Sequence, residues 1–67
     1  MKTVSGRQFA KVLRDNGWQL ERVTKHHIYK SADGKATVSV PVHNNQDLKV
    51  GILSALLRDS GLTEADL

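Results

Sequence analysis

Residues 27–40, HIYKSADGKATVSV, contain the strongest indication of the fold. Two runs with β-branched and aromatic members, 27–30 and 36–40, flank the pair Asp33-Gly34. Asp-Gly is a favoured pair in tight hairpin turns, because both residues tolerate a positive φ. In the second run, valines alternate with hydroxyl residues, which is typical of an antiparallel strand with one buried face. The stretch therefore predicts a β-hairpin.

Upstream of this hairpin, the chain carries the marks of a helix followed by a strand. Ser5 can cap the helix, and Gln8 stands three residues later, as in a capping box. Apolar residues then recur at helical spacing until Asn16-Gly17, a pair that tolerates the left-handed conformation of a helix end. Residues 18–24, WQLERVT, include β-branched and aromatic residues and predict a strand.

Downstream of the hairpin, the apolar spacing returns to that of a helix. We expect this second helix to begin near Leu48, with Asp47 as its N-cap and Gly61 as its C-cap, and residues 63–66 to add one more turn. The order is then α-β-β-β-α. Because a three-stranded sheet must bury one face, we expect an α+β fold in which two helices cover one face of a three-stranded antiparallel sheet.

The length and composition limit the class of protein. A chain of 67 residues without a linker or repeat is one domain, residues 1–67, which excludes a two-domain enzyme. The absence of cysteine excludes a disulfide framework, a thiolate metal site and a cysteine nucleophile, and it fits a reducing compartment. No apolar run resembles a signal peptide or approaches the roughly 20 residues of a membrane span. We therefore expect a cytoplasmic protein without a membrane partner.

The charge favours a polyanionic partner. Ten Lys and Arg against seven Asp and Glu give a formal charge of +3. In the first helix, Arg7, Lys11 and Arg14 fall at positions i, i+4 and i+7 and form a cationic stripe opposite the apolar face. Lys25 and Lys30 add positive charge near the hairpin. These cations are either a solvated surface or contacts to the phosphates of a nucleic acid.

Three histidines lie in the same region, which raises the question of a metal site. His26-His27 begins the hairpin and His43 follows its far end. Neighbouring residues of a regular strand face opposite sides, so the first two histidines cannot bind one ion together, and no cysteine or carboxylate spacing helps. We expect neither a metal nor another cofactor.

Strand phase gives the two adjacent histidines different surroundings. If Ile28 belongs to the buried set, His27 and Tyr29 lie with Thr37 and Ser39 on the face that the helices leave open. An imidazole donates and accepts protons near neutral pH, so an exposed histidine among lysines is a candidate general acid or base. The alternative interpretation is an ordinary surface histidine.

The whole set of motifs resembles the HicA family of toxin ribonucleases. The resemblance rests on these segments in this order: Ser5-Gly6, Asn16-Gly17-Trp18, His26-His27-Ile28-Tyr29-Lys30, Asp33-Gly34, Val40-Pro41-Val42-His43, Leu48-Lys49-Val50-Gly51 and Leu57-Arg58-Asp59-Ser60-Gly61-Leu62-Thr63. It implies a double-stranded-RNA-binding-domain-like fold. It also implies an mRNA interferase, the toxin of a toxin–antitoxin module, which a HicB antitoxin inhibits by covering the catalytic histidine.

The resemblance assigns the catalytic role to His27, which directly precedes the pair Ile28-Tyr29. The implied reaction needs no metal: a base helps the RNA 2′-OH attack its own phosphate, while Lys25 or Lys30 can offset the charge that develops. Many members carry Gly-Ser where this chain has Thr24-Lys25. We expect the free toxin to be a monomer.

Two other functions remain compatible with the same residues. The first is a non-catalytic RNA-binding module, whose cations contact A-form phosphates while His27 is only exposed. The second is a domain that binds only other proteins. Cleavage of RNA without metal separates the enzyme from both.

Overall fold

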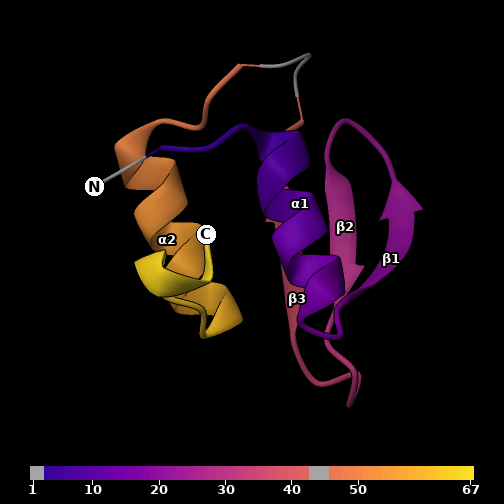
Figure 1. Cartoon of the computed structure of the whole chain (residues 1–67). Coiled ribbons are helices and arrows are strands. Elements are labelled where there is room, and N and C mark those ends of the chain that lie inside the picture. Colours follow the sequence, from indigo (N-terminus) through magenta and orange to yellow (C-terminus); the bar gives the residue numbers. More distant parts are fainter. Residues whose placement is uncertain (1–2, 43–45) are drawn as a thin grey trace.

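The computed structural model describes residues 3–42 and 46–67 and confirms the α-β-β-β-α order (Figure 1). The sheet is antiparallel with strand order β1-β2-β3. The elements, in chain order, are α1 (Gly6–Asp15), β1 (Gln19–Val23), β2 (His27–Lys30), β3 (Thr37–Val40), α2 (Val50–Ser60) and the short 3₁₀ helix η1 (Glu64–Asp66). The double-stranded-RNA-binding-domain-like fold expected from the sequence is therefore confirmed, and η1 is the predicted extra turn.

Helix α1 begins and ends at the expected residues. The Ser5 hydroxyl accepts a hydrogen bond from the Gln8 N–H at 3.1 Å, which satisfies one of the free donors of the first turn. At the other end, Gly17 has a φ of 92°, and this left-handed residue lets the Trp18 N–H reach the Leu13 carbonyl at 3.0 Å. The chain thereby turns directly from α1 into β1.

The register of the sheet decides which residues share a face. His27 pairs with Val40, and Tyr29 pairs with Val38, so these four side chains point to the same side. That side is the buried one, since Tyr29, Val38 and Val40 are each at most 3% exposed. The expected phase of β2 is therefore wrong: Ile28 lies on the helix-free face, and His27 and Tyr29 lie on the helix-covered face.

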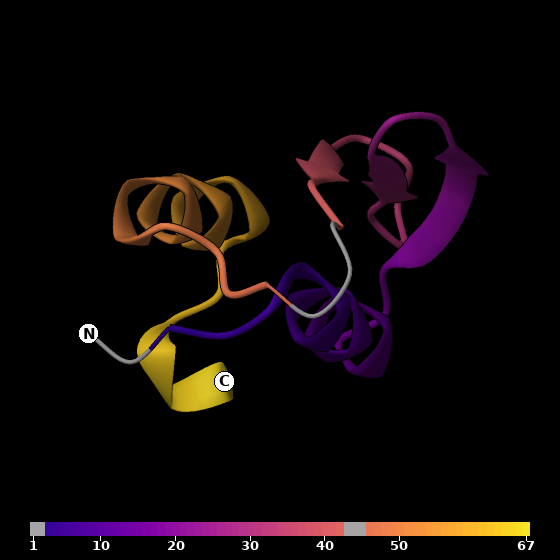
Figure 2. The same cartoon turned by 90° about the horizontal axis from the view of Figure 1, so that it is seen from above.

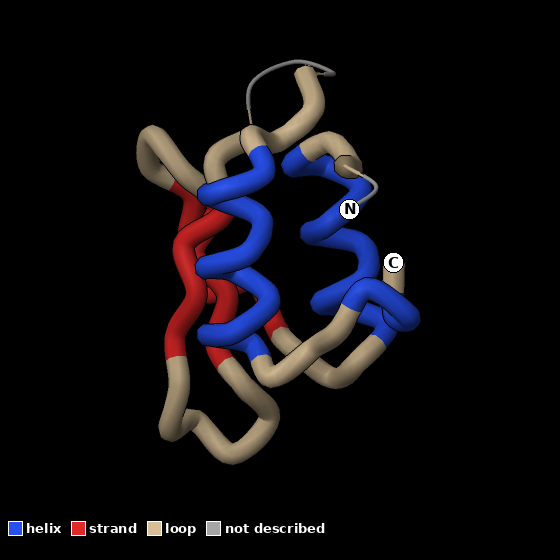
Figure 3. The backbone as a smooth tube through the Cα atoms, turned by 90° about the vertical axis from the view of Figure 1, so that its left-hand side faces the viewer, coloured by secondary structure: helices blue, strands red, loops and turns tan. Residues whose placement is uncertain are grey.

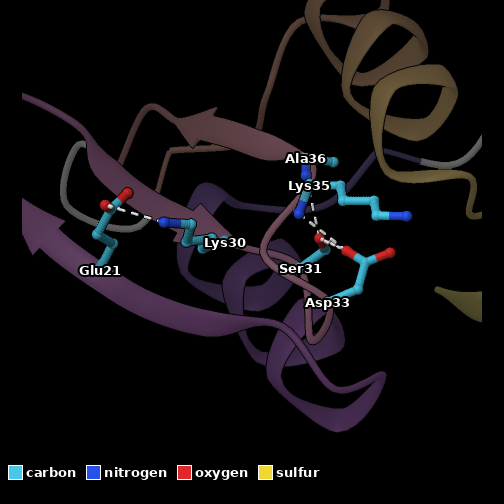
Figure 4. A network of polar contacts seen from close by, with 6 residues as sticks. All are labelled: Glu21, Lys30, Ser31, Asp33, Lys35 and Ala36. Atoms are coloured by element: carbon cyan, nitrogen blue, oxygen red, sulfur yellow. Dashed lines mark hydrogen bonds and ion pairs between the residues drawn. The ribbon is translucent and has the colours of Figure 1, made fainter.

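The connection between β2 and β3 is a six-residue loop rather than a two-residue turn. Gly34 has the positive φ, 74°, that its Asp-Gly pair predicts. The Asp33 carboxylate accepts hydrogen bonds from the Ser31 hydroxyl at 2.5 Å and from the Lys35 N–H at 2.9 Å (Figure 4). These bonds satisfy polar groups of the loop internally, as short polar side chains commonly do in turns.

Helix α2 begins two residues later than expected. Its N-cap is Lys49, without a side-chain capping bond, and Asp47 instead forms an isolated antiparallel bridge with Ser5. Next to this bridge, the Leu48 N–H donates to the Val4 carbonyl at 2.8 Å. This long-range pairing holds residues 47–48 in an extended conformation, so the helix cannot start there. Its end at Gly61, with a φ of 74°, is as predicted.

Both helices contribute to one core. Figures 2 and 3 show α1 packed against the sheet and α2 beside α1. Helix α1 contacts β1 and β3, and helix α2 contacts β3. The buried apolar residues are Val4, Phe9, Ala10, Leu13, Trp18, Tyr29, Val38, Val40, Leu48, Leu53, Leu56 and Leu57. The core thus fixes the position of α1 relative to β2, on which the site depends.

Candidate active site

A surface cavity of about 260 Å³ lies between α1 and the sheet. We call it the arginine pocket. It is lined by Arg7, Ala10, Arg14, Leu20, His27, Tyr29 and Val42. Residues from α1, β1, β2 and the segment after β3 therefore meet at one place, and the sequence-predicted catalytic histidine is among them.

Helical spacing explains the contribution of α1. Residues three, four and seven apart lie on the same side of a helix, so Arg7, Ala10 and Arg14 face the pocket together. Ala10 is only 4% exposed, and its methyl group is the smallest side chain that L-residues offer at such a position. Both arginines are exposed. The helix thus presents two guanidinium groups on either side of a small buried residue.

His27 is half-buried at the start of β2, on the side of the sheet that faces α1. Tyr29, two residues along the strand on the same face, is 3% exposed and belongs to the core. The expectation that His27, Tyr29, Thr37 and Ser39 share a helix-free face is wrong. Thr37 and Ser39 are exposed on the opposite side of the sheet, because they alternate with the buried valines of β3.

His26 has different surroundings from His27, as expected, but it precedes β2 and lies in the β1–β2 turn. Its Nδ1 lies 3.1 Å from the Ser39 hydroxyl on the helix-free face. Its backbone carbonyl accepts hydrogen bonds from the Thr24 N–H at 2.9 Å and the Thr24 hydroxyl at 3.4 Å. Thr24 thus closes the β1–β2 turn directly onto His26.

A second cavity, of about 330 Å³, lies beside His26 and the start of α2. Its lining residues are His26, Pro41, Gln46, Asp47, Leu48, Lys49 and Ile52. None of these lines the arginine pocket, so the two adjacent histidines face two separate cavities.

The five cations expected to bind RNA do not gather at one place. Arg7 and Arg14 line the arginine pocket, whereas Lys11 is exposed on α1 and is not among the described residues that line it. Lys25 is exposed in the β1–β2 turn. Lys30 lies on the helix-free face, where its Nζ is 3.8 Å from a Glu21 carboxylate oxygen (Figure 4). The side chains of this ion pair are 47% and 41% exposed, so it contributes little to stability.

Two further observations concern metals and membranes. Within residues 3–42 and 46–67, no three His, Cys, Asp or Glu side chains are grouped so that they could hold a metal ion. His43, the third histidine of this region, lies outside the described residues. In the same described ranges, neither helix is long and apolar enough to cross a membrane.

The arginine pocket combines two kinds of chemistry. Guanidinium groups bind phosphate through paired N–H donors, and an imidazole moves protons near neutral pH. Sequence reasoning found the histidine and the arginines but missed Ala10, Leu20 and Val42 as pocket residues. Ala10 could have been identified from the sequence, because a residue three positions after Arg7 and four before Arg14 lies between them on the same side of the helix.

The fold and the site define a small basic α+β domain of the double-stranded-RNA-binding-domain-like type. The family described as HicA toxin of bacterial toxin-antitoxin matches residues 6–62, which include every helix and strand except η1. The chain belongs to this family and is the toxin of a toxin–antitoxin module, whose inhibitory partner is an antitoxin. No curated protein matches the chain.

Proposed function

We propose that this toxin is a metal-independent endoribonuclease that cleaves mRNA with His27 as its catalytic residue. One observation carries the proposal: His27 shares a cavity with two arginines rather than standing alone on the surface. A phosphodiester held by these cations would lie beside a group able to move a proton. The substrate is mRNA, so the protein acts in the cytoplasm.

The proposed reaction is an intramolecular transfer at phosphorus. His27 takes the proton of the ribose 2′-OH, and the 2′-oxygen attacks the adjacent phosphorus. The new bond joins phosphorus to the 2′-oxygen, and the bond from phosphorus to the 5′-oxygen breaks. The imidazolium then returns its proton to the departing 5′-oxygen. The products are a 2′,3′-cyclic phosphate and a 5′-OH, and DNA cannot react because it lacks the nucleophile.

The experiment is cleavage of an end-labelled RNA by the purified toxin in excess chelator. The expected products carry a cyclic phosphate and a 5′-OH, and an RNA with one 2′-deoxyribose at the cleaved position stays intact at that bond. A requirement for a divalent ion, or cleavage of the 2′-deoxy bond, would rule out this chemistry.

The antitoxin is proposed to be a HicB-like protein that inhibits by covering His27. The toxin carries a charge of +3, which favours a partner with a complementary acidic surface. Protection of the His27 ring from chemical modification in the inhibited complex is the expected result. A fully inhibited complex in which His27 remains as reactive as in the free toxin would contradict occlusion.

The alternative function is a non-catalytic RNA-binding module of the same fold. The observation that favours it is the spread of Lys11, Lys25 and Lys30 outside the arginine pocket, since distributed cations suit contacts along a phosphate backbone. Tight RNA binding without any cleavage, under the conditions just described, would establish this alternative.

A further inference from the structure

We propose that Arg7 and Arg14 hold the reacting phosphate and stabilise the charge that develops on it during cleavage. This inference rests on the proposed function. In this proposal, the two arginines take the charge-stabilising role that the sequence suggested for Lys25 and Lys30. Lys30 lies on the opposite face of the sheet from His27 and pairs with Glu21. The arginines, by contrast, line the same cavity as His27.

The two guanidinium groups are available for a ligand. Throughout the part of the chain that the structure describes, neither Arg7 nor Arg14 takes part in an ion pair or a side-chain hydrogen bond. They stand about two helical turns apart along α1, with Ala10 between them. A tetrahedral anion between the two could use N–H donors from both sides.

The position of Arg7 has no explanation in the stability of α1. It lies in the first turn, which contains no acidic residue, and the helix dipole makes a cation unfavourable there. Arg14 lies in the last turn, where a cation is favourable. A cation that costs helix stability, has no partner among the described residues and lines a cavity with a histidine indicates a binding role.

The chemistry explains why arginine suits this place. In the pentacoordinate transition state, the non-bridging oxygens carry more negative charge than in the starting diester. Groups aimed at these oxygens therefore bind the transition state more tightly than the substrate, which raises the rate of the chemical step. Guanidinium stays protonated throughout, so His27 remains the group that moves protons. Its planar fork contacts two oxygens at once, which an ammonium group does not do.

The test compares Arg7→Gln and Arg14→Gln with Arg22→Gln. Arg22 is an exposed arginine on the helix-free face, paired with Ile28, so it controls for the loss of one arginine. The measurement is the single-turnover rate at saturating toxin, because saturation removes any effect on affinity. Each pocket variant is expected to lower this rate on the order of 100-fold, and Arg22→Gln leaves it unchanged. Thermal unfolding confirms that all three variants are folded.

Two further variants separate positioning from attraction. Lys11→Gln removes a cation from the same helix outside the pocket, and its defect should be confined to RNA affinity. Arg14→Lys keeps the charge but not the fork, so it should recover only part of the rate lost in Arg14→Gln. If Arg7→Gln and Arg14→Gln regain the parent rate at saturation, the arginines only attract RNA and the proposal is wrong.

A second measurement does not depend on activity. Inorganic phosphate is titrated at fixed pH while the His27 ring signals are followed by NMR. We expect saturable changes in the parent and in Arg22→Gln, and none in the Arg7→Gln, Arg14→Gln double variant. Such arginine-dependent binding in a toxin that cleaves no RNA would support the phosphate site and reject the nuclease. Cleavage that continues at the parent rate in the double variant would reject the site and keep the nuclease.

Discussion

His26 and His27 are neighbours in the chain, yet their side chains lie in different surroundings. His27 lies on the helix-covered face, where α1 adds two arginines to its surroundings. His26 precedes β2, and its ring meets Ser39 of β3 and lines the cavity beside the start of α2. The difference arises because β2 begins at His27, whereas His26 is the last residue of the β1–β2 turn, and because α1 packs over the face that His27 shares. A candidate catalytic residue is therefore identified by the face that it shares, rather than by its residue type.

The largest expected effect separates these two histidines directly. His27→Ala should lower the RNA cleavage rate by about 10²–10⁴-fold, because a positioned acid–base group contributes that much. His26→Ala should keep the rate within about tenfold, since its contact with Ser39 is a single hydrogen bond. Both variants are compared at saturating toxin in chelator.

Similar cleavage rates in the two variants would contradict the separate roles of the two histidines. Equal loss of activity in His26→Ala, in a protein that still unfolds at the parent temperature, would place part of the chemistry beside His26. An active His27→Ala variant would remove the catalytic role of the helix-covered face altogether.

The next largest effect concerns the helix that completes the core beside β3. Leu53 of α2 is fully buried, whereas its neighbour Ile52 is 42% exposed. Leu53→Ala should lower the free energy of unfolding by about 2–5 kcal/mol, because it leaves a cavity in the core. Ile52→Ala should change it much less. Denaturant unfolding of both variants measures the difference, and equal effects would mean that α2 presents another side to the sheet.

A smaller effect is expected where α1 meets the segment that leaves β3. A Cβ atom at Gly6 would lie 2.1 Å from the Pro41 carbonyl oxygen, so Gly6→Ala must push Pro41 and Val42 away. We expect a loss of about 1–3 kcal/mol, as for other overpacked sites. Because Val42 lines the arginine pocket, the cleavage rate should fall as well.

Gly51→Ala is the matched control for this substitution. A Cβ atom at Gly51 meets none of the described residues within 4 Å, and Gly51 belongs to α2. Alanine should therefore stabilise the protein by about 0.5–1 kcal/mol through its higher helix propensity. Thermal unfolding of the two variants should move in opposite directions. A neutral Gly6→Ala variant would mean that the two segments are not in close contact.

The smallest effect is expected in the loop that connects β2 to β3. The hydrogen bond from Ser31, and then that from the Lys35 N–H, lowers the pKa of Asp33 below its ordinary value. A lowered folded pKa means that the carboxylate stabilises the loop above the ordinary pKa of about 4 and loses this effect as the pH falls through the folded value. Asp33→Asn should therefore be slightly less stable than the parent at neutral pH, with the gap closing below pH 4.

NMR titration of the Asp33 carboxyl checks the cause of this shift. Ser31→Ala should raise the pKa of Asp33 toward its ordinary value, because the Ser31 bond is the largest contribution. An unchanged titration in Ser31→Ala would show that the loop hydrogen bonds do not hold the carboxylate.

Most of the fold was predictable because its determinants are local. The Ser5 cap, the Asn16-Gly17 and Gly61 helix ends and the valine alternation of β3 each act within a few residues. The start of α2 was not predictable in this way. Asp47 has the chemistry of an N-cap, but its backbone pairs with that of Ser5, close to the N-terminus. No local pattern reveals such a pairing.

The wrong phase of β2 has a more instructive cause. Ile28 and Tyr29 are both apolar, so the two-residue alternation of a strand fits either of them as the buried residue. The pairing supplies the missing constraint: a turn centred on Asp33-Gly34 places Tyr29 opposite Val38, which is the register that the structure has. Because Val38 is buried, its cross-strand partner Tyr29 is buried with it. The site residues were thus mostly identifiable, but their shared cavity required the register and the position of α1.

The residues that line the arginine pocket all precede α2, whereas three of the core leucines come from α2 itself. Substitutions in α2 should therefore change the amount of folded toxin, whereas substitutions in the pocket should change the rate at which each molecule reacts. Substitutions that weaken α2 enlarge the unfolded fraction and expose the chain to proteases, so they lower abundance while intact molecules keep their chemistry. Selection against toxicity could therefore favour changes in α2 that leave the pocket, and any inhibitor that recognises it, untouched.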